Sequence, residues 1–319
     1  MFQLAQEEPF LLALNMNLKI KVLIILALFF SSCFPNEEGI EPRPRLNKSV
    51  EIDAGETRKD ISFYSLENDS LMATANPQDW DLYFENESVK INYFRSMRVA
   101  PLDEAWQFKL DTAGLQFSYL TVNSENQWHI DLDRNYVVDY GFDDDYNHLG
   151  FYKLHITKLD KGYRIQYSPI ESAYELEAIV ELENGYYNIL KKEILSIPLE
   201  SEYDIAFGKY TDYVIFPDEE ADYLVYGTLL GNASAVRLEN KFEDVNATAL
   251  DSIDFNSNQK SIIGWDWKSY NLDAGAYTVE ENLTYIIKTN SGFVYKLRFV
   301  NFYNSKGISG HPTFEYALL

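Results

Sequence analysis

Apolar and polar residues alternate along most of the chain beyond residue 50. In one clear stretch Tyr295, Leu297 and Phe299 fall on one face, and the two cations between them fall on the other. Side chains of a β-strand point alternately to opposite faces, so this period of two is typical of a half-buried strand. A helical period of apolar residues is not sustained beyond residue 50, apart from a short piece at 218–221. The pattern therefore predicts an all-β protein built of antiparallel sheets.

The alternation at residues 295–299 recurs at residues 152–156, where Lys153 and His155 are expected to face outward. Each stretch follows a shorter apolar strand, at residues 136–139 and 285–288. Turn-forming residues connect the two strands of the second pair, so each pair is predicted to form an antiparallel hairpin. The connection in the first hairpin, residues 140–149, is longer and acidic.

A second pattern also occurs twice, at residues 80–84 and 203–207, with an aspartate at the second position of each, Asp81 and Asp204. These aspartates are expected to accept hydrogen bonds from nearby backbone N–H groups rather than to take part in chemistry. Because the same two patterns appear twice in the same order, the chain is predicted to hold two tandem antiparallel β domains. Their predicted bounds are residues 50–172 and 173–319.

The N-terminal part carries export and anchoring signals. A short basic stretch precedes an apolar run at residues 22–30, which is too short for a membrane span and is typical of a signal peptide. We expect the signal peptide at residues 1–32, with translation starting at Met16. The small residues before Cys33 resemble the lipobox of bacterial lipoproteins, in which this cysteine is acylated. Residues 33–49, rich in proline and glutamate, are predicted to form a lipidated tether.

The charge balance excludes several classes of function. The 319 residues contain 27 Lys and Arg against 50 Asp and Glu, a formal net charge of −23. Such a chain repels the phosphates of nucleic acid, so nucleic acid is not an expected partner. The sequence also lacks nucleophile motifs, zinc-protease motifs and phosphate-binding glycine loops, so no catalytic residues are predicted and an enzyme is not expected.

Four segments occur in an order that resembles the HmuY-like lipoproteins. They are residues 203–207 (Tyr-Asp-Ile-Ala-Phe), 265–270 (Trp-Asp-Trp-Lys-Ser-Tyr), 283–299 and 307–316. The resemblance covers most of the second predicted domain, and the first domain resembles a diverged copy, so both are predicted to be of HmuY-like type. The family implies an all-β surface or secreted protein that binds haem and passes it to an outer-membrane receptor.

The resemblance also implies where a ligand binds. The best-known member ligates haem iron with two histidines, but here Tyr270 lies nearest the first ligand position and residues 208–263 contain neither His nor Met. Trp265, Trp267 and Tyr270 are predicted to line an aromatic cleft. Haem is the candidate cofactor, with Tyr270 either a tyrosinate ligand to ferric iron or an aromatic residue that ends a strand.

The long acidic connection offers a candidate metal site. His148 lies there beside three carboxylates, those of Asp143, Asp144 and Asp145. Imidazole and carboxylate groups on one loop can converge on a divalent ion, although a charge run is more often a solvated loop. Of the other histidines, His129 aligns with Lys268, and both are expected to face outward.

Together these observations predict a lipid-anchored binding protein of the bacterial envelope, exposed at the cell surface on the outer membrane. It would capture haem or a related iron-bearing ligand for an outer-membrane transporter. The alternative is a non-haem surface lipoprotein that binds glycans or mediates adhesion through exposed aromatic side chains on the same scaffold. A third possibility makes the first domain a spacer.

Overall fold

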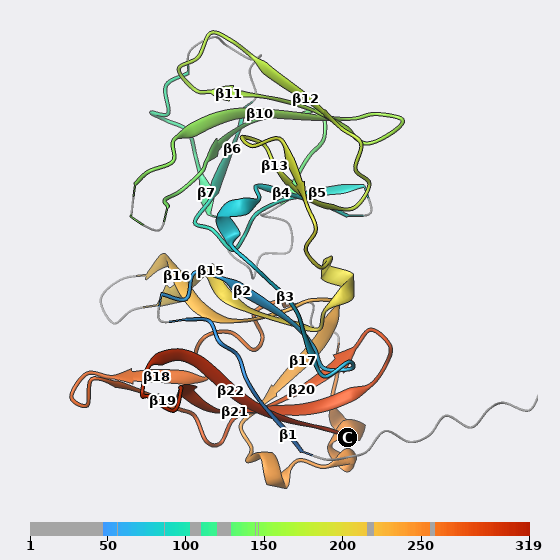
Figure 1. Cartoon of the computed structure of the whole chain (residues 1–319), viewed down its shortest axis with the longest axis vertical. Coiled ribbons are helices and arrows are strands. Elements are labelled where there is room, and N and C mark those ends of the chain that lie inside the picture. The colour runs from blue at the N-terminus through green and yellow to red at the C-terminus, as the bar shows by residue number, and fades with distance from the viewer. Residues whose placement is uncertain are drawn as a thin grey trace, which may run out of the picture. The chain divides into compact units, whose positions relative to one another are not determined.

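The computed structural model describes residues 47–55, 57–85, 87–102, 110–119, 129–143, 145, 147–215, 220–255 and 259–319. All described residues belong to one compact unit. They form an almost entirely β structure, which confirms the predicted all-β class (Figure 1). No helix within these residues combines the length and apolar character that crossing a membrane requires.

Two antiparallel sheets contain the predicted hairpins. The β10 sheet has the order β12 (Leu176–Val180), β11 (Tyr163–Pro169), β10 (Phe151–Lys158), β9 (Asn135–Asp139), β6 (Arg98–Leu102) and β7 (Ser118–Tyr119). The β21 sheet has the order β1 (Lys48–Glu51), β22 (Ser309–Leu318), β21 (Val294–Tyr303), β20 (Thr284–Thr289) and β17 (Ala233–Leu238).

Two further sheets and a separate hairpin complete the strands. The β4 sheet has the order β14 (Glu193–Leu195), β13 (Gly185–Asn188), β4 (Leu82–Glu85), β5 (Ser88–Ile91) and β8 (His129–Ile130). The β15 sheet has the order β16 (Glu220–Leu230), β15 (Ile205–Ile215), β2 (Ile61–Ser65) and β3 (Ser70–Ala75). The hairpin is β18 (Lys268–Asn271) with β19 (Ala276–Val279), and the 3₁₀ turns are η2 (Pro77–Asp79), η3 (Glu200–Glu202), η4 (Phe242–Asp244) and η5 (Ala247–Ser252).

The sheets match each other strand by strand. The order β12-β11-β10-β9-β6 corresponds to β1-β22-β21-β20-β17, and β14-β13-β4-β5 corresponds to β3-β2-β15-β16. The register of the two predicted hairpins is also the same, because Tyr136 lies opposite Leu154 just as Tyr285 lies opposite Leu297. The hairpins inferred from the repeated alternation are therefore confirmed.

Strands β1–β3 and β12–β14 exchange places between the two sets of sheets. In chain order β1–β3 precede β4, yet β1 pairs with β22 and β2 pairs with β15. Conversely, β12–β14 precede β15, yet β12 pairs with β11 and β13 pairs with β4. Each set of sheets is thus built from both sides of residue 172, the predicted boundary. The division into domains at that residue stays a prediction.

Aromatic and aliphatic side chains form two cores that share the β15 sheet. The first core contains Trp80, Phe84 and Leu154, and the second contains Tyr285 and Leu297. Alternate residues of β15 serve the two cores, since Ala206 and Tyr210 pack in the first while Ile205 and Phe207 pack in the second. A sheet buried on both faces explains why almost every residue at the start of β15 is buried.

Lys153 departs from the sequence prediction. It points away from the core as the alternation implies, but it is buried rather than solvated, at 1% exposure. The chain beyond β11 covers it, and the Lys153 Nζ donates a hydrogen bond to the Ser172 carbonyl oxygen at 3.1 Å. Burial lowers the pKa of this ammonium. His155, also expected on the surface, is half-buried.

The two predicted aspartates perform the same structural task. Asp81 accepts a hydrogen bond from the Ile189 backbone N–H at 2.8 Å, and Asp204 accepts one from the Leu66 N–H at 2.7 Å. Each aspartate therefore ties down the turn that comes after a strand of the exchanged segment, β13 or β2. Backbone capping by these residues is confirmed.

Candidate functional site

The three aromatic residues predicted to line a cleft lie in different environments. Trp267 is buried and stacks on Phe299, with ring centroids 3.9 Å apart. Trp265 is half-buried and donates its Nε1–H to Asp212 Oδ2 at 3.2 Å. Tyr270 is 51% exposed and packs edge-on against Tyr277. Of the three, Tyr270 presents the most surface to a ligand.

Two hairpins project to the same side of the β21 and β15 sheets, the β15–β16 hairpin and the shorter β18–β19 hairpin (Figure 1). The register of β15 and β16 puts Tyr213, Leu224 and Tyr226 on one face. Tyr213 and Leu224 are 49% and 40% exposed, whereas Tyr226 packs into the second core. We call these three residues, with Tyr270 and Tyr277 of the shorter hairpin, the aromatic face.

The ring of Phe302 packs against the bases of both hairpins. Phe302 lies 6.0 Å from Tyr226 and 5.0 Å from Tyr277, measured between ring centroids. Lys268, the first residue of β18, donates to the Tyr226 carbonyl oxygen at 2.8 Å. The aromatic face is therefore fixed to a packed floor, which limits the entropy that a bound ligand would lose by ordering it.

Lys268 is the unusual charged residue of this floor. It is buried, although the alignment of the two repeats predicted that it faces outward. Its Nζ lies 4.3 Å from the ring centroid of Trp267 and 5.0 Å from that of Phe302. It also donates to the carbonyl oxygens of Tyr226 and Trp265. Burial, together with nearby Arg58, lowers the pKa of Lys268 to about 7.

Arg58 reaches the same floor from the turn before β2. Its guanidinium carbon lies 5.2 Å from the ring centroid of Phe302 and 5.9 Å from that of Tyr277. The backbone of Arg58 is left-handed, with φ of 51°, which costs an L-residue roughly 1–2 kcal/mol. Hydrogen bonds hold the turn, from the Arg58 N–H to the Gly55 carbonyl and from Nη2 to Ser309 Oγ. The fold thus keeps a strained residue over two aromatic rings.

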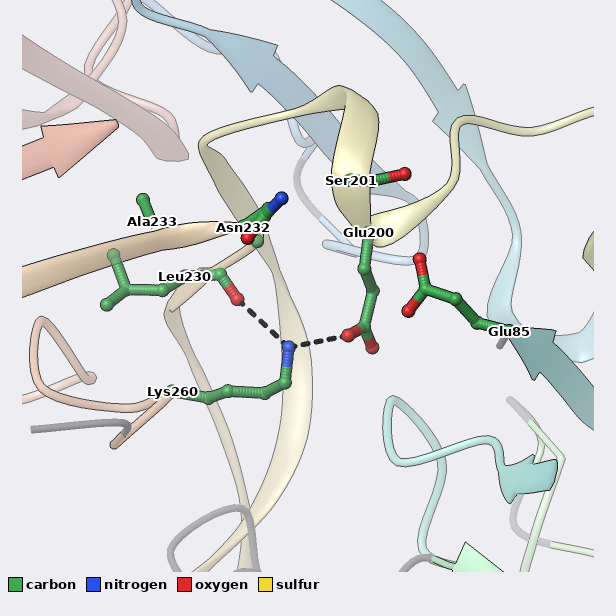
Figure 2. Close-up of a pocket in the computed structure, with 8 residues that line it drawn as sticks. Glu85, Glu200, Ser201, Leu230, Asn232, Ala233 and Lys260 are labelled. Atoms are coloured by element: carbon green, nitrogen blue, oxygen red, sulfur yellow. Dashed lines mark hydrogen bonds and ion pairs between the residues drawn. The ribbon is translucent and has the colours of Figure 1, made fainter. Parts of the chain in front are cut away.

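A polar pocket of about 310 Å³ lies elsewhere, where η3 meets the ends of β4 and β16 (Figure 2). It is lined by Glu85, Glu200, Ser201, Leu230, Gly231, Asn232, Ala233 and Lys260. Figure 2 shows the Lys260 ammonium between the Glu200 carboxylate and the Leu230 carbonyl oxygen.

Several hydrogen bonds hold Glu200 in place in this pocket, which we call the acid–lysine pocket. Its carboxylate accepts hydrogen bonds from Lys260 Nζ at 2.8 Å, from Lys90 Nζ at 3.0 Å and from Tyr93 Oη at 2.7 Å. Burial raises the pKa of Glu200, but the two ammonium groups and the Tyr93 hydroxyl outweigh it and lower the pKa from 4.5 to about 2. All of these hydrogen-bond partners are side chains of the protein itself, so the main role of the Glu200 carboxylate is structural.

The predicted metal residues do not form a cluster among the residues described. His148 Nε2 lies 2.8 Å from Asp139 Oδ1, a carboxylate that also pairs with Arg98. Asp143 caps its own loop by accepting the backbone N–H groups of Asp145 and Asn147. No group of three His, Cys, Asp or Glu suited to a metal occurs in the described part of the chain. Asp144 lies outside it, so the metal site stays a prediction.

Cys33, the signal peptide at residues 1–32 and most of the tether at residues 33–49 also lie outside the described residues. The structure therefore begins just before the first strand of the β21 sheet.

A family model described as "HmuY protein" matches residues 57–316. The matched span includes strands β2–β21, most of β22 and all of the aromatic face. The chain belongs to the HmuY family.

Among solved structures, this HmuY-family chain is similar to apo PinO from Porphyromonas gingivitis, with 8% identity, a TM-score of 0.30 and coverage of 86% of this chain and 98% of that one. It is also similar to the apo HmuY analog of Tannerella forsythia, with 14% identity, a TM-score of 0.28 and coverage of 88% and 98%. Because both scores are low, the assignment stands on the family match. No match is found among curated proteins.

Sequence reasoning missed the polar residues beneath the aromatic face of this HmuY-family chain. Lys268 was assigned to the surface by its place in the alternation, and Tyr226 and Arg58 carried no motif. Arg58 stands more than 200 residues before Lys268. Only the pairing of β1 with β22 and of β2 with β15 brings it to this floor.

Proposed function

We propose that the protein binds haem or a related iron-bearing ligand at the aromatic face, as a carrier rather than an enzyme. Membership of the HmuY family is the observation that carries this proposal. A porphyrin is a flat apolar disc, and the exposed rings of Tyr213 and Tyr270 with the side chain of Leu224 supply apolar surface for it.

Iron coordination would differ from the histidine pair of the best-known family member. Tyr213 and Tyr270 both present phenol groups at the aromatic face and are about half exposed. A tyrosinate is an established axial ligand of ferric haem. Tyr270 is the primary candidate because it also lies nearest the family's ligand position in the sequence.

The proposal also includes where the protein is anchored in the cell envelope. Acylation at Cys33 would anchor the protein to the outer membrane, and the tether would let the aromatic face reach an outer-membrane transporter. Because the net charge of −23 opposes direct adsorption to anionic lipid, a covalent anchor would be needed to hold the protein at the membrane.

Titrating the purified protein with hemin tests the ligand. We expect a shifted and sharpened Soret band at micromolar protein, and loss of the tyrosinate charge-transfer band in Tyr270→Phe with affinity lowered about tenfold or more. Tyr174→Phe is the matched control, since Tyr174 is 82% exposed and lies between β11 and β12, away from this face. An unchanged spectrum in the unsubstituted protein would exclude haem.

Glycan binding is the second candidate, favoured by the exposure of Tyr213 and Tyr270. Aromatic rings of this kind stack on the apolar faces of sugars. If hemin leaves the spectrum unchanged while a glycan array gives signals that Tyr270→Ala abolishes, this alternative replaces the haem proposal.

A further inference from the structure

Three hydrogen-bond donors under the aromatic face are buried and have no partner among the described residues. They are Arg58 Nε, Tyr226 Oη and Trp267 Nε1. Buried polar groups are nearly always hydrogen-bonded, and each one left without a partner costs about 1–3 kcal/mol. All three side chains contact the same ring, because Arg58 lies over Phe302, Tyr226 packs on Phe302 and Trp267 packs edge-on to it. These three donors under the aromatic face therefore lack a hydrogen-bond acceptor among the described residues.

The same floor holds two cations without a counter-ion. Lys268 and Arg58 make no ion pair with a carboxylate anywhere in the residues that the structure covers. The acidic neighbour Asp266 is already engaged, since it accepts a hydrogen bond from Arg237 Nη1 at 2.7 Å. Two like charges in a poorly solvated site repel each other, and an anion between them would offset both charges.

From these observations we propose that Arg58, Lys268, Tyr226 and Trp267 form a binding site for a carboxylate group. The proposal rests on the proposed function in one respect, namely that the ligand of the aromatic face supplies the carboxylate. The planar guanidinium of Arg58 suits a carboxylate because it presents parallel N–H groups. Arg58 is partly exposed while the other three are buried, so the carboxylate enters past Arg58.

The aromatic surroundings strengthen such a site. The rings of Phe302, Trp267 and Tyr226 keep water away from the Lys268 ammonium, which lies within 6 Å of all three ring centroids. Electrostatic attraction is stronger where the local dielectric is low. A neutral isostere of the ligand would gain none of this attraction, which gives the experiment its control.

The test uses benzoate and benzamide, two probes of the same size that differ in charge. Calorimetric titration of the purified protein at about pH 6 is expected to detect benzoate and not benzamide. Arg58→Met and Lys268→Met should each weaken benzoate binding about tenfold or more. Lys296→Met is the matched control, because the Lys296 ammonium also donates to two carbonyl oxygens and lies 4.2 Å over the Phe242 ring.

Protonation gives an independent readout. Arg58 from the turn before β2, Asp266 ahead of β18 and Tyr226 of β16 are the titratable and charged groups that face Lys268. With its pKa near 7, Lys268 loses its charge as the pH rises from about 6 to 8, so benzoate affinity should fall over that range. In Lys268→Met this pH dependence should disappear. Trp267→Phe, which keeps a ring against Phe299, should weaken binding by a smaller factor.

Failure of this site and failure of the haem proposal give different results. If hemin and its dimethyl ester bind equally and benzoate does not bind, the carboxylate site is overturned while haem binding stands. If hemin does not bind but benzoate does, with the loss expected for Arg58→Met, the carboxylate site stands and haem is excluded. Benzoate binding that is unchanged in both methionine variants also overturns the site.

Discussion

Residues 62–85 and 185–208 have the same backbone and carry different chemistry. Each segment runs from a strand through a turn and a second strand to a 3₁₀ turn, an aromatic residue and a capping aspartate. The turn residues Asp69 and Lys192 both have left-handed φ, 52° and 58°. The aromatic residues Trp80 and Tyr203 are both extended, with φ of −136° and −129°. The scaffold is thus repeated in detail.

The two segments lead into hairpins of different length. The hairpin after the first aspartate, β4–β5, has strands of four residues, whereas β15–β16 has strands of eleven. The extension beyond the shared part carries Tyr213, Leu224 and Tyr226, so within the described ranges the aromatic face exists in one copy alone. A repeated framework fixes the fold, and lengthening one hairpin supplies the surface at which we propose that the ligand binds.

The largest expected effect separates the two capping aspartates. Asp81 pairs with the buried Arg95 at 2.9 Å, so Asp81→Asn keeps an acceptor for Ile189 but leaves a buried guanidinium without its counter-ion. We expect a loss of about 3–5 kcal/mol in the free energy of unfolding, measured with urea. Asp204 has no ion-pair partner among the described residues and burial raises its pKa, so Asp204→Asn should cost about 1 kcal/mol. Equal losses would contradict this assignment.

Glu200 offers the next comparison, because the equivalent position in the first segment is Pro77, which carries no charge. Glu200→Gln leaves Lys90 and Lys260 facing each other, and should lower the free energy of unfolding by about 3 kcal/mol. Ser201→Ala is the control from the same pocket, since Ser201 is exposed, and should change it by less than about 0.5 kcal/mol. Comparable values for the two variants would show that the ion pairs contribute nothing.

The pH dependence of stability tests the same group. Since the pKa of Glu200 is lowered in the folded protein, its contribution is fully present above about pH 4.5, the range in which the unfolded chain is also ionised. It should be lost as the pH falls from about 4.5 toward 2. Urea unfolding over this range should therefore show a steeper loss of stability in the unsubstituted protein than in Glu200→Gln. Parallel curves would contradict the lowered pKa.

The smallest effects concern the two left-handed turn residues, and they should have opposite signs. Lys192 is exposed, so Lys192→Gly removes backbone strain and should raise the free energy of unfolding by about 0.5 kcal/mol. Asp69 accepts hydrogen bonds from Tyr64 Oη, Tyr316 Oη and Lys48 Nζ. Asp69→Gly loses these three hydrogen bonds and should lower the free energy of unfolding by about 1–3 kcal/mol, although it relieves the same backbone strain. Thermal unfolding would compare the two variants.

Local patterns predicted the hairpins and the role of the two repeated aspartates, although the N–H groups that these aspartates accept from lie 108 and 138 positions away in the sequence. The period of two predicted both hairpins, and the repeated Asp81 and Asp204 were recognised as backbone caps. These features depend on strand geometry and on short hydrogen bonds. Lys153 and Lys268 were misjudged because alternation tells which side a residue faces and not what covers that side.

The exchange of strands was not predictable from local patterns. The segment at residues 48–75 has the same strand character whichever sheet it joins, and β1 pairs with a strand more than 250 residues away. The acid–lysine pocket was missed for another reason, since Glu200 is one of 50 acidic residues and no spacing marks it. Burial against Lys90 and Lys260 distinguishes it, and burial is a tertiary property.

The pairing of β1 with β22 also determines how the molecule responds to mechanical load. A pull on the chain ahead of Lys48 acts first on the four-residue ladder at the edge of the β21 sheet. Beyond it, single backbone hydrogen bonds from Ile52 and Ala54 continue toward the Arg58 turn. Tension that peels this edge would therefore reach the Arg58 turn within a few residues, before either core opened.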